Sequence, residues 1–168
     1  MYMLQWQMLV PALTHCLETG LLYFVSKKTY TLYTLNLTDF THNTTSTREN
    51  LFGDGSFNSQ PDQIIRGKGG ELVYLTEDGG RSAGVYAIDS ENKRYAIFEA
   101  YSDLYKGDET TGLASSPDGR KMYACFQDCG CDSSSDVDFT CGCLLEFSRE
   151  DGKPFHGSTL SLKFHGAS

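Results

Sequence analysis

The chain lacks the features that identify a nucleic-acid-binding or membrane-spanning protein. Its 168 residues include 14 Lys and Arg against 22 Asp and Glu, a net charge of −8, and the basic residues form no patch. Nucleic-acid affinity depends on Lys and Arg contacting phosphates, so we expect no nucleic-acid partner. Residues 1–13 are too short and too polar to span a bilayer, and they lack the basic start and long apolar core of a secretory signal. We expect no membrane span.

The chain also lacks the short motifs of common catalytic centres. It has no Gly-x-Ser-x-Gly nucleophile elbow, no Gly-x₄-Gly-Lys-Ser/Thr phosphate loop and no Gly-x-Gly-x-x-Gly after a strand. Its four histidines are scattered without the spacing of metal ligands: His15, His42, His156 and His165. Nucleophilic catalysis is therefore not indicated. The acidic composition suits either a solubilising surface or the binding of cations.

What the chain does contain is one pattern in three copies. Tyr23, Tyr74 and Tyr123 lie 51 and 49 residues apart, each inside a short segment with the composition of a strand. Each copy predicts about four short strands separated by turns, among them the Pro117-Asp118-Gly119 turn. A fixed period of that size in strand-forming segments is typical of β-propeller blades, and a β-sandwich with accidental similarity is the competing interpretation.

The repeat defines the predicted fold class and domain organisation. We expect an all-β, β-propeller-like chain of three to four four-stranded antiparallel blades, forming a single segment over residues 1–168. The blades cover approximately residues 12–59, 60–107 and 108–165. Because closed propellers typically have 4–8 blades, we expect part of a propeller. We interpret residues 1–11 as the remnant of a preceding blade or an artificial start.

Four of the six cysteines form two Cys-x-Cys pairs on either side of one loop. The pairs allow nested disulfides, in which Cys129 bonds Cys143 and Cys131 bonds Cys141. A four-thiolate zinc site is the competing interpretation, although structural zinc sites usually have two to four residues between paired cysteines. Disulfides require an oxidising compartment, and N-glycosylation motifs at Asn36 and Asn43 agree with one. We therefore expect a secreted, cell-surface or lumenal protein.

Carboxylates mark the inner strands, which line the central channel of a propeller. Glu18, Asp62 and Glu109 lie in or beside the predicted inner strands, and Glu77 directly follows the second tyrosine strand. Lys27 stands in the corresponding place of the first copy. Converging carboxylates repel one another unless a cation is bound, and Ca²⁺ prefers oxygen ligands. The pattern therefore predicts a calcium site, and the competing interpretation is that these side chains cap turns.

Residues 60–64, 72–80 and 109–123 resemble the PhoX-like β-propeller family, which includes secreted bacterial alkaline phosphatases. The resemblance covers about residues 12–165, and it implies a calcium-containing propeller. In the bacterial phosphatases it implies an iron–calcium cluster that hydrolyses phosphate monoesters. Only Glu77 and Glu109 lie in segments that match well enough to carry over as metal ligands. The phosphatases' cysteine-containing iron-binding segment is not recognisable here, so calcium transfers better than Fe³⁺.

Two function predictions follow. In the first, the chain belongs to a metal-dependent phosphoric monoester hydrolase whose substrate is a small phosphate ester. In the second, it is a non-catalytic, calcium-stabilised propeller segment that binds a protein or a glycan. Both predictions place the functional residues at the inner strands.

Overall fold

The computed structural model describes residues 13–16, 19–47, 60–67, 72–78, 84–99, 109–127 and 142–155. Within these ranges the chain has strands and no helix, which confirms the all-β prediction, so none of these residues forms a helix long and apolar enough to cross a membrane. The strands are β1 (Leu13–Cys16), β2 (Leu21–Ser26), β3 (Thr31–Asn36), β4 (His42–Ser46), β5 (Gln60–Arg66), β6 (Leu72–Asp78), β7 (Gly84–Asp89), β8 (Arg94–Glu99), β9 (Thr110–Ser115), β10 (Lys121–Phe126) and β11 (Cys143–Ser148).

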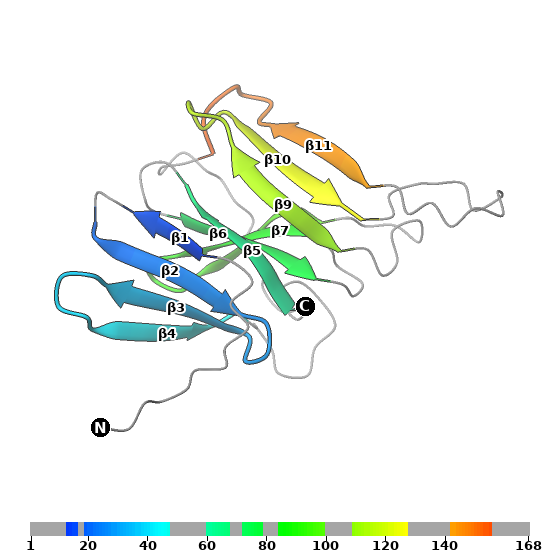
Figure 1. Cartoon of the computed structure of the whole chain (residues 1–168). Coiled ribbons are helices and arrows are strands. Elements are labelled where there is room, and N and C mark those ends of the chain that lie inside the picture. The colour runs from blue at the N-terminus through cyan, green and yellow to red at the C-terminus, as the bar shows by residue number, and fades with distance from the viewer. Residues whose placement is uncertain are drawn as a thin grey trace, which may run out of the picture.

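The strands form three antiparallel sheets, and each sheet is a run of consecutive strands. The first sheet has the order β1-β2-β3-β4, the second β5-β6-β7-β8 and the third β11-β10-β9. The second sheet lies between the other two (Figure 1). Of the about four strands predicted for the third copy, three lie in the described ranges 109–127 and 142–155. Three sheets of consecutive strands are thus present among the described residues, whereas the blade boundaries and closure into a propeller stay predictions.

The strand register shows that the tyrosine repeat is structural. Tyr23 pairs with Thr14, and Tyr74 and Tyr123 likewise pair with the inner-strand residue nine positions before them. In both β5 and β9 the inner strand then carries one extra residue, a β-bulge, before the pairing resumes. The same local geometry therefore recurs in the second and third sheets.

The bulge of β9 explains one glycine. Gly112 has a φ of 59°, a left-handed conformation that side chains with a Cβ atom adopt at a cost. A Cβ atom at this position would also lie 3.0 Å from the Sγ atom of Cys125 on the paired strand. Both the backbone and the neighbouring side chain therefore require glycine here.

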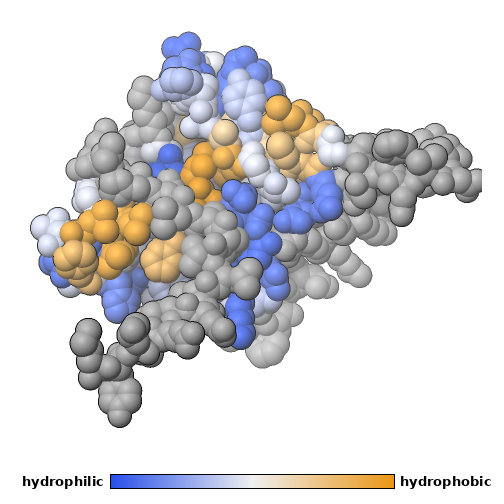
Figure 2. Space-filling view, viewed as in Figure 1, coloured by the Kyte–Doolittle hydropathy of each residue, from blue (hydrophilic) through white to orange (hydrophobic). Residues whose placement is uncertain are grey.

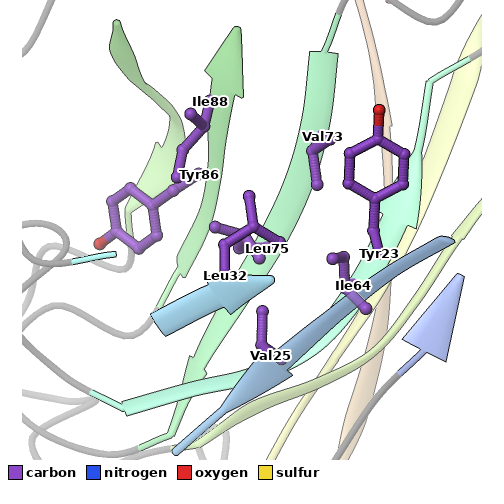
Figure 3. Packing of buried hydrophobic residues seen from close by; sticks show 8 residues of the cluster. All are labelled: Tyr23, Val25, Leu32, Ile64, Val73, Leu75, Tyr86 and Ile88. Carbon is purple, nitrogen blue, oxygen red and sulfur yellow. The ribbon is translucent and has the colours of Figure 1, made fainter. Parts of the chain in front are cut away.

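Two hydrophobic clusters hold the three sheets together. The cluster between the first and second sheets contains eight buried side chains, which Figure 3 shows: Tyr23, Val25, Leu32, Ile64, Val73, Leu75, Tyr86 and Ile88. The cluster between the second and third sheets contains another eight: Leu72, Tyr74, Val85, Ala87, Leu113, Met122, Ala124 and Phe126. Because successive residues of a strand point to opposite faces, β6 supplies Val73 to one cluster and Tyr74 to the other. The second sheet is consequently buried on both faces.

Candidate functional site

The inner strands of the three sheets bring the predicted carboxylates to one end of the molecule. Strand β5 contacts both β1 and β9, so the three inner strands lie side by side. Asp62 belongs to β5, Glu77 pairs with the neighbouring Pro61 from β6, and Glu109 directly precedes β9. The structure thus brings Asp62 and Glu77 into adjacent positions and Glu109 near them, whereas Glu18 lies outside the described residues.

A lysine of the first sheet lies between the carboxylates of the other two. The Nζ atom of Lys27, in the turn after β2, is 2.7 Å from Oδ1 of Asp62 and 3.8 Å from Oε1 of Glu109. The side chain of Lys27 is 22% exposed and that of Asp62 is 9% exposed, so water screens this pair only partly. One ammonium group therefore links side chains from three sheets that are far apart in the sequence.

Lys27 was the residue that the sequence analysis did not assign to the site. The available indication was its position directly after the first tyrosine strand: Lys27 follows Tyr23 by four residues, as the acidic Asp78 follows Tyr74. The sequence could not show which carboxylate would face Lys27.

The described carboxylates do not by themselves fit a calcium site. Among the described residues, no group of three or more His, Cys, Asp or Glu side chains is arranged to hold a metal ion. Ca²⁺ takes six to eight oxygen ligands, and here an ammonium group already neutralises part of the negative charge. Calcium and Fe³⁺ at Glu18, Asp62, Glu77 and Glu109 stay predictions.

The competing interpretation, that acidic side chains cap turns, holds for other aspartates. Oδ1 of Asp118 accepts hydrogen bonds from the Ser116 hydroxyl at 2.6 Å and the Arg120 backbone N–H at 3.1 Å. These hydrogen bonds, that from Ser116 first, lower the pKa of Asp118 because they stabilise the charged form. Gly119 follows with a φ of 70°, as the predicted Pro-Asp-Gly turn requires. Asp62 is different, because its recorded partner is a lysine of another sheet.

Arg66 secures the other end of the junction between the first and second sheets, because it is the last residue of β5 whereas Asp62 lies near the start of that strand. Its guanidinium donates to the Thr19 hydroxyl at 2.9 Å and to the Tyr23 hydroxyl at 3.2 Å. It also lies over the Tyr23 ring, 5.2 Å from the ring centroid, in a cation–π contact. This arginine therefore contacts the first sheet.

A polar cleft of about 420 Å³ opens between the first and second sheets. The volume is in the range of pockets that bind small molecules. Hydroxyl, amide and carboxylate groups contribute much of its lining, beside a hydrophobic floor: Thr34, Asn43, Thr44, Thr45, Asp89, Ser90 and Asn92, with Tyr23, Leu32, Val73 and Ile88. The Thr45 hydroxyl donates to Oδ1 of Asn92 at 3.1 Å and joins the two walls.

The turn between β7 and β8 shapes one wall of this cleft. Asn92 has a φ of 63°, which asparagine tolerates better than most residues. Oδ1 of Asp89 accepts hydrogen bonds from the backbone N–H groups of Glu91 and Lys93, both at 2.8 Å, and Oδ2 accepts one from the Tyr95 hydroxyl at 2.6 Å. Asp89 is thus committed to holding the turn, and the neutral groups beside it remain to face a ligand.

Of the four loop cysteines, one lies within the described residues. Cys143 begins β11, whereas Cys129, Cys131 and Cys141 lie outside these ranges. Among the cysteines whose side chains are described, Cys125 is free and Cys143 is not. The choice between nested disulfides and a zinc site stays a prediction.

No protein-family model matches the chain, and no curated protein matches it. The resemblance to PhoX-like propellers therefore rests on the three segments quoted above. The geometry of the inner-strand carboxylates and of the polar cleft is the basis for assigning a function.

Proposed function

We propose that the chain is a non-catalytic segment of a β-propeller that binds a glycan. The observation that carries the non-catalytic part is the contact of Lys27 with Asp62 and Glu109. A protein cation supplies the charge that the sequence pattern assigned to a metal, so the inner-strand cluster joins sheets instead of activating a substrate. No metal-dependent step is needed to account for the described carboxylates.

The propeller part of the proposal is supported by how the sheets repeat. Each sheet is an antiparallel meander that starts at its inner strand, and the three inner strands lie side by side. Each sheet also packs one face on the next, as radially stacked blades do. A β-sandwich has two packed sheets, whereas here a sheet with two buried faces lies between two others.

The glycan is proposed from the chemistry of the cleft. Sugars present hydroxyl groups that exchange hydrogen bonds with neutral hydroxyl and amide side chains, and Thr34, Asn43 and Ser90 supply such groups. Hydrophobic side chains such as Leu32 beside them suit the C–H faces of a sugar ring. A protein segment bound in the same cleft is the competing outcome.

The glycan proposal is tested with sugars as probes on chain produced without N-glycosylation, so that Asn43 is unmodified. N-acetylglucosamine, galactose and mannose are titrated while amide chemical shifts are followed by NMR. We expect saturable shifts for residues of β3, β4 and the β7–β8 turn with at least one sugar. Thr34→Val should weaken them, and Thr38→Val, in the exposed turn after β3, should not. Absence of saturable shifts with all three sugars would reject this ligand class.

A second candidate function is a calcium-dependent phosphoric monoester hydrolase, with Fe³⁺ as the further metal that the resemblance implies. The observation favouring it is Glu77, which is 2% exposed and lies beside buried Asp62. Buried carboxylates in proteins are paired or coordinate metals. A metal there would require further oxygen ligands from outside the described residues, and a small phosphate ester would be the substrate.

Metal content separates the two functions. Elemental mass spectrometry of the extensively dialysed chain should find no stoichiometric metal if Lys27 is the resident cation. Stoichiometric calcium that falls in Glu77→Gln and Glu109→Gln, but not in the exposed control Glu146→Gln, would instead favour the hydrolase. Hydrolysis of p-nitrophenyl phosphate would then be assayed on the same samples.

We further propose that the chain is secreted, cell-surface or lumenal and that Cys143 takes part in a disulfide of the loop cysteines. Cys143 is not a free thiol, in contrast to Cys125. Peptide mapping of the unreduced chain, by mass spectrometry, would give the pairs. Zinc in stoichiometric amount with four alkylatable thiols after chelation would contradict the disulfides.

A further inference from the structure

The two end sheets each have one face on which, in the part of the chain that the structure describes, no further sheet packs. We call the side of each sheet that carries the repeat tyrosine its tyrosine face and the other side its reverse face. The tyrosine face of the first sheet packs on the reverse face of the second, and the tyrosine face of the second packs on the reverse face of the third. The reverse face of the first sheet and the tyrosine face of the third remain.

The remaining face of the first sheet has the chemistry of a face that is buried elsewhere in the chain. Phe24 and Tyr33 pair across β2 and β3, and their rings stack with centroids 4.8 Å apart. At the equivalent positions of the second sheet, Leu75 pairs with Tyr86, and both are buried against the first sheet. Leu22 with Leu35 likewise corresponds to Val73 with Ile88.

Exposure is what distinguishes the two equivalent faces. Leu75 and Tyr86 are 1% and 0% exposed, whereas Phe24 and Tyr33 are only half-buried. Hydrophobic side chains gather over β2 and β3 on the visible side of the first sheet (Figure 2). The reverse face of the first sheet is therefore a hydrophobic surface that is only half-buried. In the second sheet, the equivalent surface is covered by the tyrosine face of the first sheet.

The remaining face of the third sheet has the matching pattern. Cys125 pairs with Leu144 as Val25 pairs with Leu32 in the first sheet, and Leu144 is 64% exposed. Tyr123 takes the position of Tyr23 and Tyr74. The face also carries Glu146, whose charge is matched by Lys121 at 2.7 Å, so it adds no net charge to the surface.

We propose that these two faces dock on each other between two copies of the chain, tyrosine face to reverse face, and close a ring of six sheets. The three sheets of the described residues make six in two copies, which is within the usual 4–8 blades, whereas three would be too few and nine too many. Each contact would repeat the junction that the chain already makes twice internally. The inference rests on the propeller arrangement proposed above, but it is independent of the ligand.

Such a dimer is head-to-tail: each of its two identical junctions uses the reverse face of one copy and the tyrosine face of the other. The test is the molar mass of the 168-residue chain by light scattering after size exclusion, at micromolar concentration. We expect twice the chain mass of 18.7 kDa. Phe24→Glu on one face and Leu144→Glu on the other should each raise the dissociation constant about 30-fold or more, as loss of an interface hot spot does.

Mixing the variants tests the head-to-tail arrangement. A mixture of Phe24→Glu and Leu144→Glu chains retains one intact junction, so we expect a heterodimer that neither variant forms alone. Leu37→Glu, in the turn after β3, is the matched control and should leave the dimer intact. Far-UV circular dichroism keeps loss of folding distinct from loss of assembly.

Three outcomes would overturn the proposal. A folded wild-type monomer would show that these faces need another partner, such as further blades of a longer chain. A dimer broken by one variant but not the other would indicate an isologous contact. A dimer that neither variant weakens would place the interface elsewhere. Sugar binding and metal content are measured separately on the same samples. Failure of the dimer proposal would therefore not count against the proposed function.

Discussion

The second and third sheets are built from similar strands but differ in burial. In β7 five of the six residues are buried, from Gly84 to Ile88, whereas in β11 all six are exposed or half-buried. Both strands carry aromatic and branched apolar residues, as Tyr86 and Leu144 illustrate. The difference lies in the neighbours, because the second sheet has a sheet on each side. Strand composition therefore indicates what can be buried, and the position in the stack decides what is.

The largest expected difference between the two sheets comes from truncating apolar side chains. Tyr86→Ala removes a fully buried ring between two sheets and should lower the free energy of unfolding by about 3–5 kcal/mol. In the monomer, at a concentration below the dissociation constant of the proposed dimer, Leu144→Ala removes a side chain that is 64% exposed and should change it by less than about 0.5 kcal/mol. Urea denaturation followed by fluorescence measures both. Equal losses would show that the outer face of β11 is covered in solution.

Charges extend the comparison, because the second sheet has a buried aspartate and the region after β11 an exposed one. Lys27→Met leaves Asp62 without its 2.7 Å partner and should cost about 1–3 kcal/mol of unfolding free energy, since stranding a buried charge is unfavourable. Lys153→Met removes an Nζ atom that is 3.5 Å from exposed Asp151 and should leave the free energy of unfolding nearly unchanged, because water screens an exposed pair. Denaturant unfolding at neutral pH measures the free energy of unfolding of both variants. If the Lys27→Met chain kept its stability and bound a divalent ion, that result would support the predicted metal site at the inner-strand carboxylates.

Two glycines sharpen the contrast between a packed and an open position within the third unit. Gly112 and Gly152 both have positive φ angles, of 59° and 64°. A Cβ atom at Gly112 would meet Cys125, whereas at Gly152 it would meet nothing within 4 Å. We expect Gly112→Ala to cost about 2 kcal/mol or more and Gly152→Ala about 1 kcal/mol. Thermal unfolding of both variants shows which substitution costs more stability. A larger loss for Gly152→Ala would contradict the packing described at the bulge of β9.

The smallest effect concerns the exposed end of the same unit. The Arg149 guanidinium donates to both carboxylate oxygens of Asp151, at 2.8 and 2.6 Å, and lowers the pKa of Asp151 from 3.8 to about 2. A depressed carboxyl pKa stabilises the fold above pH about 3.8, and that contribution is lost as the pH falls through about 2. Arg149→Ala should return the pKa towards 3.8, as a carboxyl ¹³C NMR titration would measure. An unchanged pKa would show that other contacts lower it.

Local sequence patterns predicted the sheets well. The tyrosine segments became β2, β6 and β10, and the apolar segments after them became β3, β7 and β11. These predictions succeeded because strand composition and turn residues act over a few neighbours. The Pro117-Asp118-Gly119 turn formed for the same reason, since its geometry is fixed by the residues themselves.

The candidate site was less accessible from the sequence. Asp62 and Glu109 were singled out as carboxylates on inner strands, but their recorded partner, Lys27, comes from a sheet tens of residues away. That contact depends on how sheets stack, which no local pattern encodes. The bulges of β5 and β9 were missed too, because a single extra residue leaves the alternation of side chains on either side nearly unchanged.

One connection of the fold indicates where the molecule can accept new sequence. The link between the second and third strands of each sheet has four residues in the first sheet (27–30) and five in the second (79–83), but sixteen in the third (127–142). Pairing of β10 with β11 nevertheless runs without a shift over six residue pairs. Closing a loop twice as long costs only about 0.6 kcal/mol. This hairpin is therefore the natural graft point for a tag, an epitope or a whole inserted domain.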